Sequence, residues 1–429
     1  MAYIPVGLEL DGAQVRISVW DGQKCAHIAG ISELPALIGL VNGQLVWALE
    51  AQKLHLNDPD AVLTLEECLD GKVLMGNGVL FTSKRLLRAY WATLLRALEE
   101  RLEAPCSIEC IAVTASLPHT QRTLLMETIA EANRNERRRP RVVDSISCVA
   151  YQYQFVMHHE DRLLLFCSLA NDGARLSLVN MDGEYVEVIS TREIPALDVQ
   201  NIQAELADLC LTLADKPRYM LPRLMQQMRY QFGALKAVDT IALYLGDRPV
   251  EVSRRDVLEC IGKRAQMLRE TVAQLYAEAQ VSPDAVDRVL LSGALTELPG
   301  VEDVLTPVFG CLPTVLENSH RAADGACLLS AVLCGDIPAD PLLLDSAGWD
   351  YHLLELETGR IAATIHHWDT IPCKAVTKFP LTPGAAYQAV QVVGTKIIPI
   401  PEAAFVAKAR VYEMTMDPNH MIQYKAILR

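Results

Sequence analysis

The chain has few of the features that mark membrane, secreted or nucleic-acid-binding proteins. Its apolar stretches, such as residues 163–169, are far too short to span a bilayer. Residues 1–12 lack the basic region and the long apolar run of a signal peptide. Lys and Arg (39) are fewer than Asp and Glu (53), which gives a net charge of −14. Nucleic-acid binding depends on clustered Lys and Arg, and the basic run at 134–141 is typical of a solvated loop, so we expect no nucleic-acid partner. From the missing signal peptide and the short apolar stretches, we expect a cytoplasmic protein with no membrane insertion.

The cysteines also lack a metal-binding pattern. There are 12 of them, but none forms a CxxC pair. Cys106 and Cys110 are separated by four positions, and no second pair with suitable spacing exists to complete a zinc site. We therefore predict no metal site and expect reduced, mostly buried thiols.

A short β pattern occurs twice. DGAQVRISVWDG (11–22) and DGARLSLVNMDG (172–183) share both Asp-Gly turns, an alanine and the apolar positions between them. In each case an apolar run precedes the first turn, which predicts a β-hairpin. Two such hairpins in one chain suggest a duplicated architecture.

Helical patterns lie between and after these hairpins, and β patterns dominate the end of the chain. Apolar residues recur every three or four positions over 87–102, 119–134, 202–213 and 257–275, and Ser253 with Asp256 forms a capping-box signature before the last of these. The small-residue segment 322–333 predicts a further helix ended by Gly335. After residue 342 the predicted elements are strands at 351–356, 361–366, 387–393, 406–414 and 422–428.

This order of elements resembles the DnaK-type (heat-shock protein 70) chaperones of the actin-like ATPase superfamily. The resemblance is carried by GLELDGAQVRISVWDG (7–22), VTASLPHTQRTLL (113–125), RVVDSISCVAYQY (141–153), FCSLANDGARLSL (166–178), VLLSGALTELPGVEDVL (289–305), RAADGACLLSAVLCGD (321–336), DPLLLDSAGWDYHLLELETG (340–359) and VYEMTMDPNHMIQYKA (411–426). It implies an α/β actin-like ATPase fold with two duplicated lobes, followed by a small β-sandwich-like module.

The resemblance also implies a domain organisation. Residues 1–336 correspond to the nucleotide-binding domain, with lobe I at about 1–160, lobe II at about 161–315 and a return helix at 320–335. Residues 337–346 correspond to the interdomain linker, which contains Leu342, Leu343, Leu344 and Asp345. Residues 347–429 correspond to a shortened peptide-binding domain, and no lid helices are recognisable after it.

The family's phosphate loops are altered at both hairpins. In the first, Glu9 matches the Asp of the magnesium shell, Asp11 matches a glycine, and Gly12 and Ala13 match two threonines. In the second, Ser168 matches the Asp of the family's DLGGGT motif, the glycines become residues 170–172, and Gly173 matches the threonine. Acidic or bulkier side chains at these positions would repel or obstruct a polyphosphate.

Other positions of the implied ATP site are changed as well. Glu67 matches the catalytic lysine, and Ser145 matches the glutamate of a Glu-Pro pair that links nucleotide state to lobe movement. On the nucleoside side, Ser292 and Gly293 match a Gly-Gly pair, and Ser319 matches an Asp near the base. Glu9, Glu67, Ser145 and Ser168 are thus degenerate equivalents of catalytic residues, and none of them is expected to perform the reaction.

We therefore expect a pseudo-ATPase that keeps the fold without useful hydrolysis; any remaining activity would be that of a slow ATPase. ATP or ADP with Mg²⁺ is the ligand that the resemblance implies, and the changes predict weak binding at most. Three functions compete: a chaperone-like protein that binds a polypeptide client without cycling, an ATP-dependent chaperone with an atypical site, and a structural platform for one dedicated protein partner.

Overall fold

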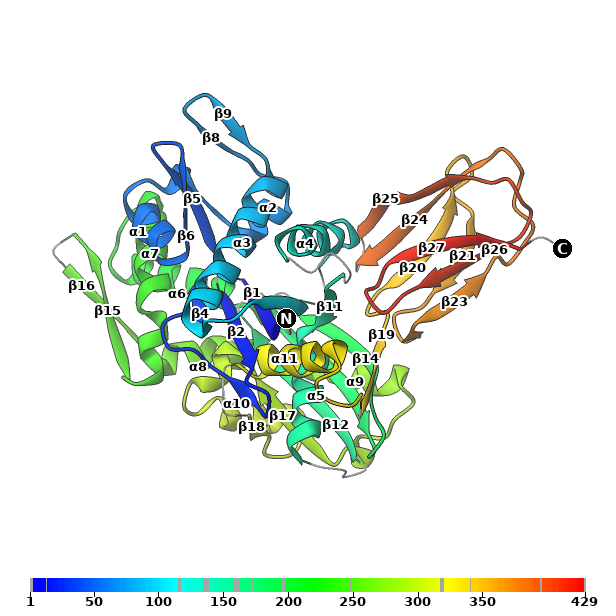
Figure 1. Ribbon diagram of the computed structural model, residues 1–429. Coiled ribbons are helices and arrows are strands. Elements are labelled where there is room, and N and C mark those ends of the chain that lie inside the picture. The colour runs from blue at the N-terminus through cyan, green and yellow to red at the C-terminus, as the bar shows by residue number, and fades with distance from the viewer. Residues whose placement is uncertain are drawn as a thin grey trace. The chain divides into compact units, whose positions relative to one another are not determined.

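The computed structural model describes residues 3–12, 14–114, 117–133, 139–157, 162–170, 173–194, 197–246, 248–316, 320–339, 341–393 and 396–427. The chain forms two compact units. The first comprises residues 1–160, 181–189 and 320–429, and the second comprises residues 161–180 and 190–319. Figure 1 shows the elements of both units, which are described separately below.

The main sheet of the first unit is built around the first hairpin. Its strands are β1 (Ile4–Asp11), β2 (Gln14–Trp20), β3 (Cys25–Ala26), β4 (Glu33–Pro35), β10 (Cys106–Val113) and β11 (Arg141–Asp144). The order is β11-β10-β1-β2-β3, with β4 also paired to β2. Strand β1 is antiparallel to β2 and parallel to β10. Nearly every residue of β1, β2 and β10 is buried, as expected for central strands covered on both faces.

Helices cover this sheet, and one of them approaches very closely. They are α3 (Ser83–Leu102), α4 (His119–Ala132), α5 (Ser145–Met157) and α11 (Arg321–Cys334). Helix α11 lies against β1 and β2 (Figure 1). A Cβ at Gly7 would lie 2.0 Å from the backbone nitrogen of Cys327, and one at Gly325 would lie 2.0 Å from the carbonyl oxygen of Cys148. Glycine at these two positions therefore permits the close packing of β1, α11 and α5.

A smaller subdomain follows the first hairpin within the same unit. It contains β5 (Leu37–Val41), β6 (Gln44–Trp47), α1 (Ala48–Asn57), β7 (Val62–Thr64), α2 (Leu65–Leu69), β8 (Leu74–Gly76) and β9 (Val79–Phe81). Strands β6, β5 and β7 form one sheet, and β8 with β9 forms a separate hairpin. These elements were not predicted from the sequence, because each is too short to give a clear periodic pattern.

The second unit contains the second hairpin. Its strands β12 (Arg162–Ala170), β13 (Gly173–Met181), β17 (Arg288–Ser292) and β18 (Thr314–Val315) lie in the order β18-β17-β12-β13. Strand β14 (Tyr185–Ile194) begins in the first unit and ends in the second. The remaining elements are α6 (Val199–Leu213), α7 (Leu221–Gln231), β15 (Thr240–Leu245), β16 (Arg248–Ser253), α8 (Arg254–Lys263), α9 (Ala265–Glu278) and α10 (Val301–Phe309).

The predicted helix over 257–275 is two helices. Ser253 and Asp256 form the expected capping box at the start of α8. Helix α8 ends at Lys263, and the backbone N–H of the next residue, Arg264, bonds to the carbonyl of Ile261 and not to that of residue 260. The Arg264 guanidinium donates to the carbonyl of Cys260 at 2.8 Å. This side chain satisfies a carbonyl at the end of α8, so α9 can begin as a separate helix.

The C-terminal β module belongs to the first unit and consists of two antiparallel sheets. One contains β20 (Asp350–Glu355), β21 (Ile361–Ile365), β24 (Ala386–Val393) and β25 (Lys396–Val406), and the other contains β23 (Cys373–Val376), β26 (Tyr412–Met416) and β27 (Ile422–Ala426). Residues of both sheets share one apolar core. The predicted strand at 406–414 is wrong, because β25 ends at Val406 and the Tyr412 hydroxyl accepts the N–H of Lys408 at 2.9 Å, which turns the chain before β26.

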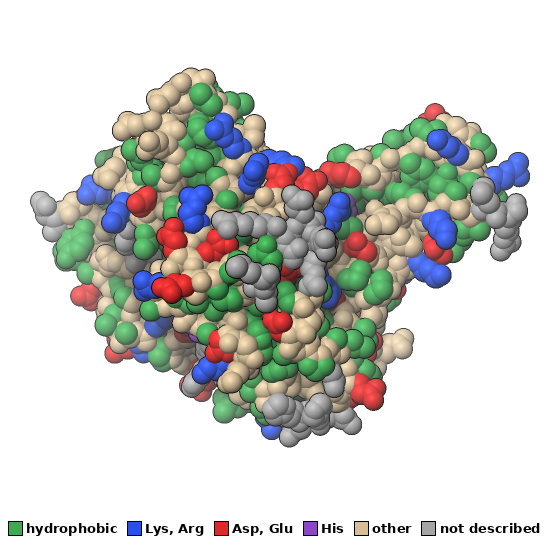
Figure 2. Space-filling view, viewed as in Figure 1, with side chains coloured by type: hydrophobic (Ala, Val, Ile, Leu, Met, Phe, Trp, Pro, Cys, Tyr) green, Lys and Arg blue, Asp and Glu red, His purple; other side chains and the backbone are tan. Residues whose placement is uncertain are grey.

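The charged side chains on one face and the cysteine thiols can be compared with the sequence-based expectations. On the face seen in Figure 2, Lys and Arg side chains alternate with Asp and Glu and do not form a single basic patch. All 12 cysteines are free, and most are buried. Among the described residues, no helix has the length and apolar character needed to cross a membrane.

Candidate nucleotide site and linker junction

The first hairpin contains a buried cluster of three charged side chains. In the antiparallel register of β1 and β2, Glu9 lies opposite Arg16. Asp11 is two residues after Glu9, so its side chain lies on the same face of the sheet. The Arg16 Nη1 donates to Glu9 Oε2 at 3.1 Å and to Asp11 Oδ2 at 2.9 Å. All three residues are at most 8% exposed. The guanidinium therefore bridges two carboxylates that come from the expected phosphate loop.

The charge on Arg16 is strongly favoured. Burial disfavours the charged guanidinium, but the attraction of Glu9 and Asp11 outweighs it and raises the pKa of Arg16 above its ordinary value. Arg16 also donates to Gln14 Oε1 at 3.3 Å, and its Nε lies 3.6 Å from Glu33 Oε1. Because a buried charge is stable only when paired and hydrogen-bonded, these four partners account for the presence of an arginine here.

The turn of the first hairpin keeps part of the expected backbone freedom. Gly12 has a φ of +53°, a conformation that favours glycine. Ala13 lies outside the described residues, so its predicted place beside a nucleotide stays a prediction. The acidic side chains that sequence reasoning assigned to this loop are present, and the structure brings Glu9 and Asp11 together through Arg16.

The second unit brings together two serines that the sequence assigns to the nucleotide site. One lies in the second hairpin, and the other ends strand β17. Ser168 on β12 pairs in register with Ser292 on β17, and both are buried. Among the described residues, Ser292 Oγ has no hydrogen-bond partner. Gly293 has a φ of +97°, and a Cβ there would lie 2.6 Å from the carbonyl oxygen of Leu169. Close approach at Gly293 therefore serves the packing of the chain's own backbone.

The second hairpin has its own buried ion pair. Gly173 opens β13 with a φ of +143°. Arg175 Nε lies 3.1 Å from Glu193 Oε1 on β14, and both side chains are at most 10% exposed. The side chain of residue 170, residues 171–172 and Ser319 lie outside the described part of the chain, so the predictions made for them are not addressed.

Two other predicted site residues have local structural partners. Glu67 occupies the N3 position of α2 and forms a capping box with Thr64, and its carboxylate pairs with Lys72 at 2.7 Å. Burial favours the neutral carboxyl, but the bonds to Lys72 and Thr64 outweigh it, and the pKa of Glu67 is lowered. Ser145 Oγ donates to the carbonyl of Val113 at 2.9 Å. Each side chain thus holds an element of the first unit in place.

The predicted linker residues form a strand of the first unit. Strand β19 (Leu342–Ser346) runs parallel to β14, with Leu342, Leu343 and Leu344 opposite residues 185–187. Asp345 is 4% exposed and accepts a hydrogen bond from Ser147 Oγ on α5 at 2.9 Å. Burial opposes ionisation of Asp345, but the nearby His420, followed by the hydrogen bonds from Ser147 and the backbone of Ser346, outweighs it and lowers the pKa of Asp345. Asp345 therefore stays charged and joins the linker to α5.

Sequence reasoning missed two groups behind the first hairpin. One is Arg16, although an arginine facing acids at alternate positions of the neighbouring strand is a detectable signal. The other is Asp324 on α11, which accepts from Ser18 Oγ at 2.8 Å and lies 2.7 Å from His27 Nε2. His27 stacks on His320 with ring centroids 4.3 Å apart. No spacing in the sequence relates these residues, since more than 290 positions separate Asp324 from His27 and Ser18.

Comparisons with known proteins match parts of this chain to heat-shock protein 70 chaperones. The family model described as "Hsp70 protein" matches residues 237–396, which include the Gly-turn strand β17, helix α11 and the linker strand β19. The chain is 28% identical over 113 residues to the chaperone protein DnaK of Thermosipho melanesiensis, a segment that covers 25% of this chain and 19% of the relative. It is 31% identical over 130 residues to the mitochondrial-type heat shock protein 70 of Encephalitozoon cuniculi, covering 30% of this chain and 22% of the relative.

A third relative is the chaperone protein dnaK3 of Thermosynechococcus vestitus, with 34% identity over 95 residues, 22% of this chain and 14% of the relative. The matched segments thus span less than a quarter of each relative's own length. The fold is the mixed α/β actin-like ATPase fold. The family match over residues 237–396, less than half of the chain, and these partial relatives support membership of the Hsp70 family.

Proposed function

We propose that this chain is an Hsp70-family pseudo-ATPase that binds polypeptide without an ATP-driven cycle, as a constitutive chaperone-like or regulatory protein. The observation that carries the proposal is the Arg16 guanidinium bonded to both Glu9 and Asp11. In a working site of this family, the first loop approaches the phosphates and a carboxylate helps to hold the magnesium shell. Here both carboxylates of the loop already have a cation as their partner.

Phosphoryl transfer would require this cluster to reorganise. A magnesium ion at Glu9 would have to displace or repel the guanidinium, and a triphosphate would meet the charge of Asp11. Glu67, at the position that matches the catalytic lysine, is also acidic and is bound to Lys72 and Thr64. These three acidic positions support the absence of useful hydrolysis. The predicted division into two lobes, a linker and a peptide-binding-like module is part of the same proposal.

Calorimetric titration of the purified chain with ATP and ADP, with and without Mg²⁺, together with a phosphate-release assay, tests the proposal. We expect weak binding or none and no turnover above the buffer rate. Glu33→Ala is the matched control, because Glu33 is half-exposed and lies at the edge of the same cluster. Turnover that is lost in both Glu9→Ala and Asp172→Ala but kept in Glu33→Ala would contradict the proposal and favour an ATP-dependent chaperone with an atypical site.

Client binding is tested with a labelled, permanently unfolded protein, for example one that is reduced and carboxymethylated. We expect fluorescence anisotropy to show binding whose affinity is the same with and without Mg-ATP. An affinity that falls when Mg-ATP is added would show that nucleotide still controls the β module, as in the ATP-dependent alternative.

A second candidate is a structural platform for one dedicated partner, and the docked linker favours it. Strand β19 is paired along β14, and Asn419 of the β module accepts from the backbone N–H of Val142 on β11 at 3.4 Å. A module held in this way suits a fixed surface better than a cycling grip. Absence of binding to the unfolded protein, together with one stoichiometric partner recovered from native lysate, would favour the platform.

A further inference from the structure

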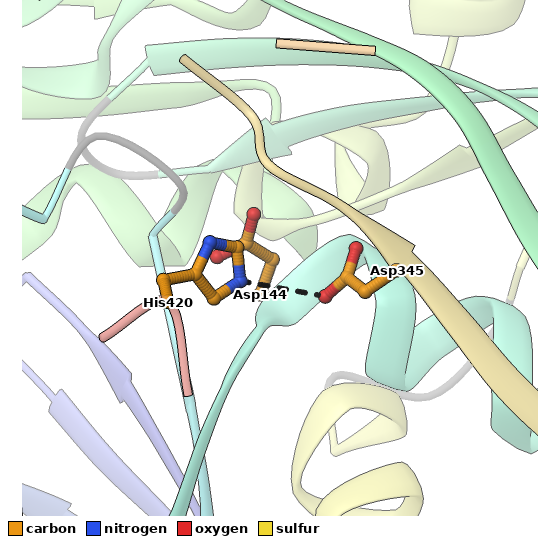
Figure 3. Close-up of side chains that lie close together, drawn as sticks. All are labelled: Asp144, Asp345 and His420. Carbon is orange, nitrogen blue, oxygen red and sulfur yellow. Dashed lines mark ion pairs between the residues drawn. The ribbon is translucent and has the colours of Figure 1, made fainter. Parts of the chain in front are cut away.

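Three buried side chains meet where the linker strand and the β module contact the rest of the first unit. Asp144 ends β11, Asp345 lies in β19, and His420 lies in the turn between β26 and β27 (Figure 3). Their exposed fractions are 3%, 4% and 2%. One potential ligand atom from each lies within 4.8 Å of the other two. Together they form a compact N/O cluster, which we call the junction cluster.

The protonation of His420 at one nitrogen is fixed by its surroundings. Nδ1 lies 3.3 Å from the carbonyl oxygen of Ala347, which can only accept a hydrogen bond, so Nδ1 carries the hydrogen. Nε2 faces Asp345 Oδ2 at 3.9 Å, along the dashed line of Figure 3. This separation is too long for a direct N–H···O bond, and within the described part of the chain Nε2 has no hydrogen-bond partner.

The two carboxylates are oriented by hydrogen bonds from neighbouring donors. Asp345 Oδ1 accepts from Ser147 Oγ and from the backbone N–H of Ser346, both at 2.9 Å. Asp144 Oδ1 accepts from the Arg122 guanidinium on α4. Ligands of metal ions are commonly held in this way, with the outer atom of each carboxylate or imidazole bound to a neighbouring donor or carbonyl.

The charges of the junction cluster leave room for a cation. The junction cluster contains two carboxylates, and Arg122, which is paired with Asp144, supplies one positive charge. Nε2 of His420 faces buried carboxylates without a hydrogen-bond partner among the described residues, and a cation between them would satisfy both the nitrogen and the carboxylates. We propose that Asp144, Asp345 and His420 bind a divalent transition-metal ion of the zinc class. One imidazole and two carboxylates match the ligand types and count of such sites, in which each ligand atom lies about 2.0–2.2 Å from the metal.

The ligands come from three elements, so metal binding is coupled to docking of the module. Asp144 belongs to the main sheet, Asp345 to the linker and His420 to the β module. The site is complete only while β19 is paired to β14 and the β26–β27 turn contacts α4, where the backbone N–H of Ile422 donates to His119 Nε2 at 3.4 Å. An ion that binds only the docked arrangement stabilises it by mass action. The metal thus acts as a clamp on the docked β module.

The test uses the full chain, freed of metal by dialysis against a chelator, in a Cys311→Ser background that removes the exposed thiol. Titration calorimetry with Zn²⁺ is expected to give one equivalent per chain, and Co²⁺ is expected to show the visible absorption of a low-coordinate N/O site. His420→Gly is the main variant, because the φ of +60° at this position suits glycine and the fold should be kept. We expect it to weaken Zn²⁺ binding about tenfold or more.

Two further measurements make the outcome decisive. Asp345→Asn should weaken binding to a similar degree, and His366→Ala, which removes a half-exposed histidine of the β module, should not. Limited proteolysis of the linker should slow when Zn²⁺ is added to the parent protein and not when it is added to His420→Gly. Equal Zn²⁺ affinity in all variants would overturn the proposal. The proposal would also be overturned if protection of the linker changed with pH in the chelated protein but did not change with Zn²⁺. In that case the cation at the junction cluster would be a proton on His420.

Discussion

The two hairpins start from the same sequence pattern and neutralise their buried charge in different ways. In the first, Arg16 lies between Glu9 and Asp11 of the adjoining strand, so the loop itself supplies both acids. In the second, Arg175 pairs with Glu193, which lies on β14 and outside the repeated segment. Positions 14 and 16 correspond to 175 and 177 in the repeat, so the two arginines are two residues apart and lie on equivalent faces of their strands.

The contrast shows two ways in which a β-hairpin of the same sequence pattern can pair a buried arginine with acidic side chains. A guanidinium can neutralise a loop that has gained acidic residues, and either neighbouring strand can supply the partner. In the first hairpin one arginine bonds to two acids of its own loop, whereas in the second Arg175 pairs with Glu193 of the following strand. We therefore expect the first arginine to contribute more to stability than the second. The three predictions below test this ranking, and Trp fluorescence helps because the five tryptophans all lie in the first unit.

Arg16→Ala is expected to have the largest effect. It removes the guanidinium that two buried carboxylates share, which should lower the free energy of unfolding by about 3–5 kcal/mol. Urea denaturation followed by Trp fluorescence measures it. The control Arg88→Ala removes a side chain that is 60% exposed and pairs with Glu131 at 3.8 Å, and should cost under about 0.5 kcal/mol.

The triple variant Arg16→Met, Glu9→Gln and Asp11→Asn separates charge from shape. It removes the buried charges together and should recover most of the stability lost in Arg16→Ala. If the triple variant is as unstable as Arg16→Ala, packing of the arginine and not charge balance would explain its effect.

Arg175→Ala should destabilise the second unit less. It leaves Glu193, which can take up a proton when its partner is lost, and the expected cost is about 2–3 kcal/mol. Because the second unit lacks tryptophan, hydrogen exchange of peptides from β12 and β13 is the appropriate measurement. Arg218→Ala, which removes the exposed partner of Asp208, is the matched control. A cost larger than that of Arg16→Ala would reverse the proposed ranking.

The parts of this comparison that depend on local pattern were predictable, and those that depend on facing strands were not. The two hairpins, the capping box of Ser253 with Asp256 and the end of α11 at Gly335 are confirmed, because turn residues and caps act over a few positions. The division of 257–275 into two helices was missed, since it depends on the Arg264 side chain reaching a carbonyl.

The candidate site shows the same limit. Glu9 and Asp11 were identified as acids in a phosphate loop, but their shared partner Arg16 follows from strand register and was not predicted. The family resemblance predicts a linker at residues 342–345, whereas the pairing of these residues with β14 and the contact of Asp345 with His420 join distant parts of the chain. No periodicity within one segment reports such contacts.

The smallest expected effect is a pH dependence of the first unit that its counterpart in the second unit should lack. Behind the first hairpin, Ser18 and His27 both bond to Asp324, whereas in the second Ser177 bonds to the neutral Thr191 hydroxyl at 2.8 Å. The hydrogen bond to Asp324 raises the pKa of His27 against the opposing effect of burial. A histidine whose pKa is raised on folding stabilises the protein below its unfolded value of about 6.5, and this contribution is lost as pH rises through the folded pKa.

His27 is partly exposed, so the contribution should be only about 0.5 kcal/mol. We expect the Trp-detected unfolding midpoint to fall slightly between pH 6 and pH 8 in the parent protein and to fall less in His27→Gln, which keeps a hydrogen-bond donor without the titrating charge. His366→Ala, far from Asp324 in sequence and paired instead with Asp350, should retain the parent's slope. An identical slope in His27→Gln would show that another group causes the pH dependence. The pair of His27 and Asp324 would then not distinguish the first hairpin from the second.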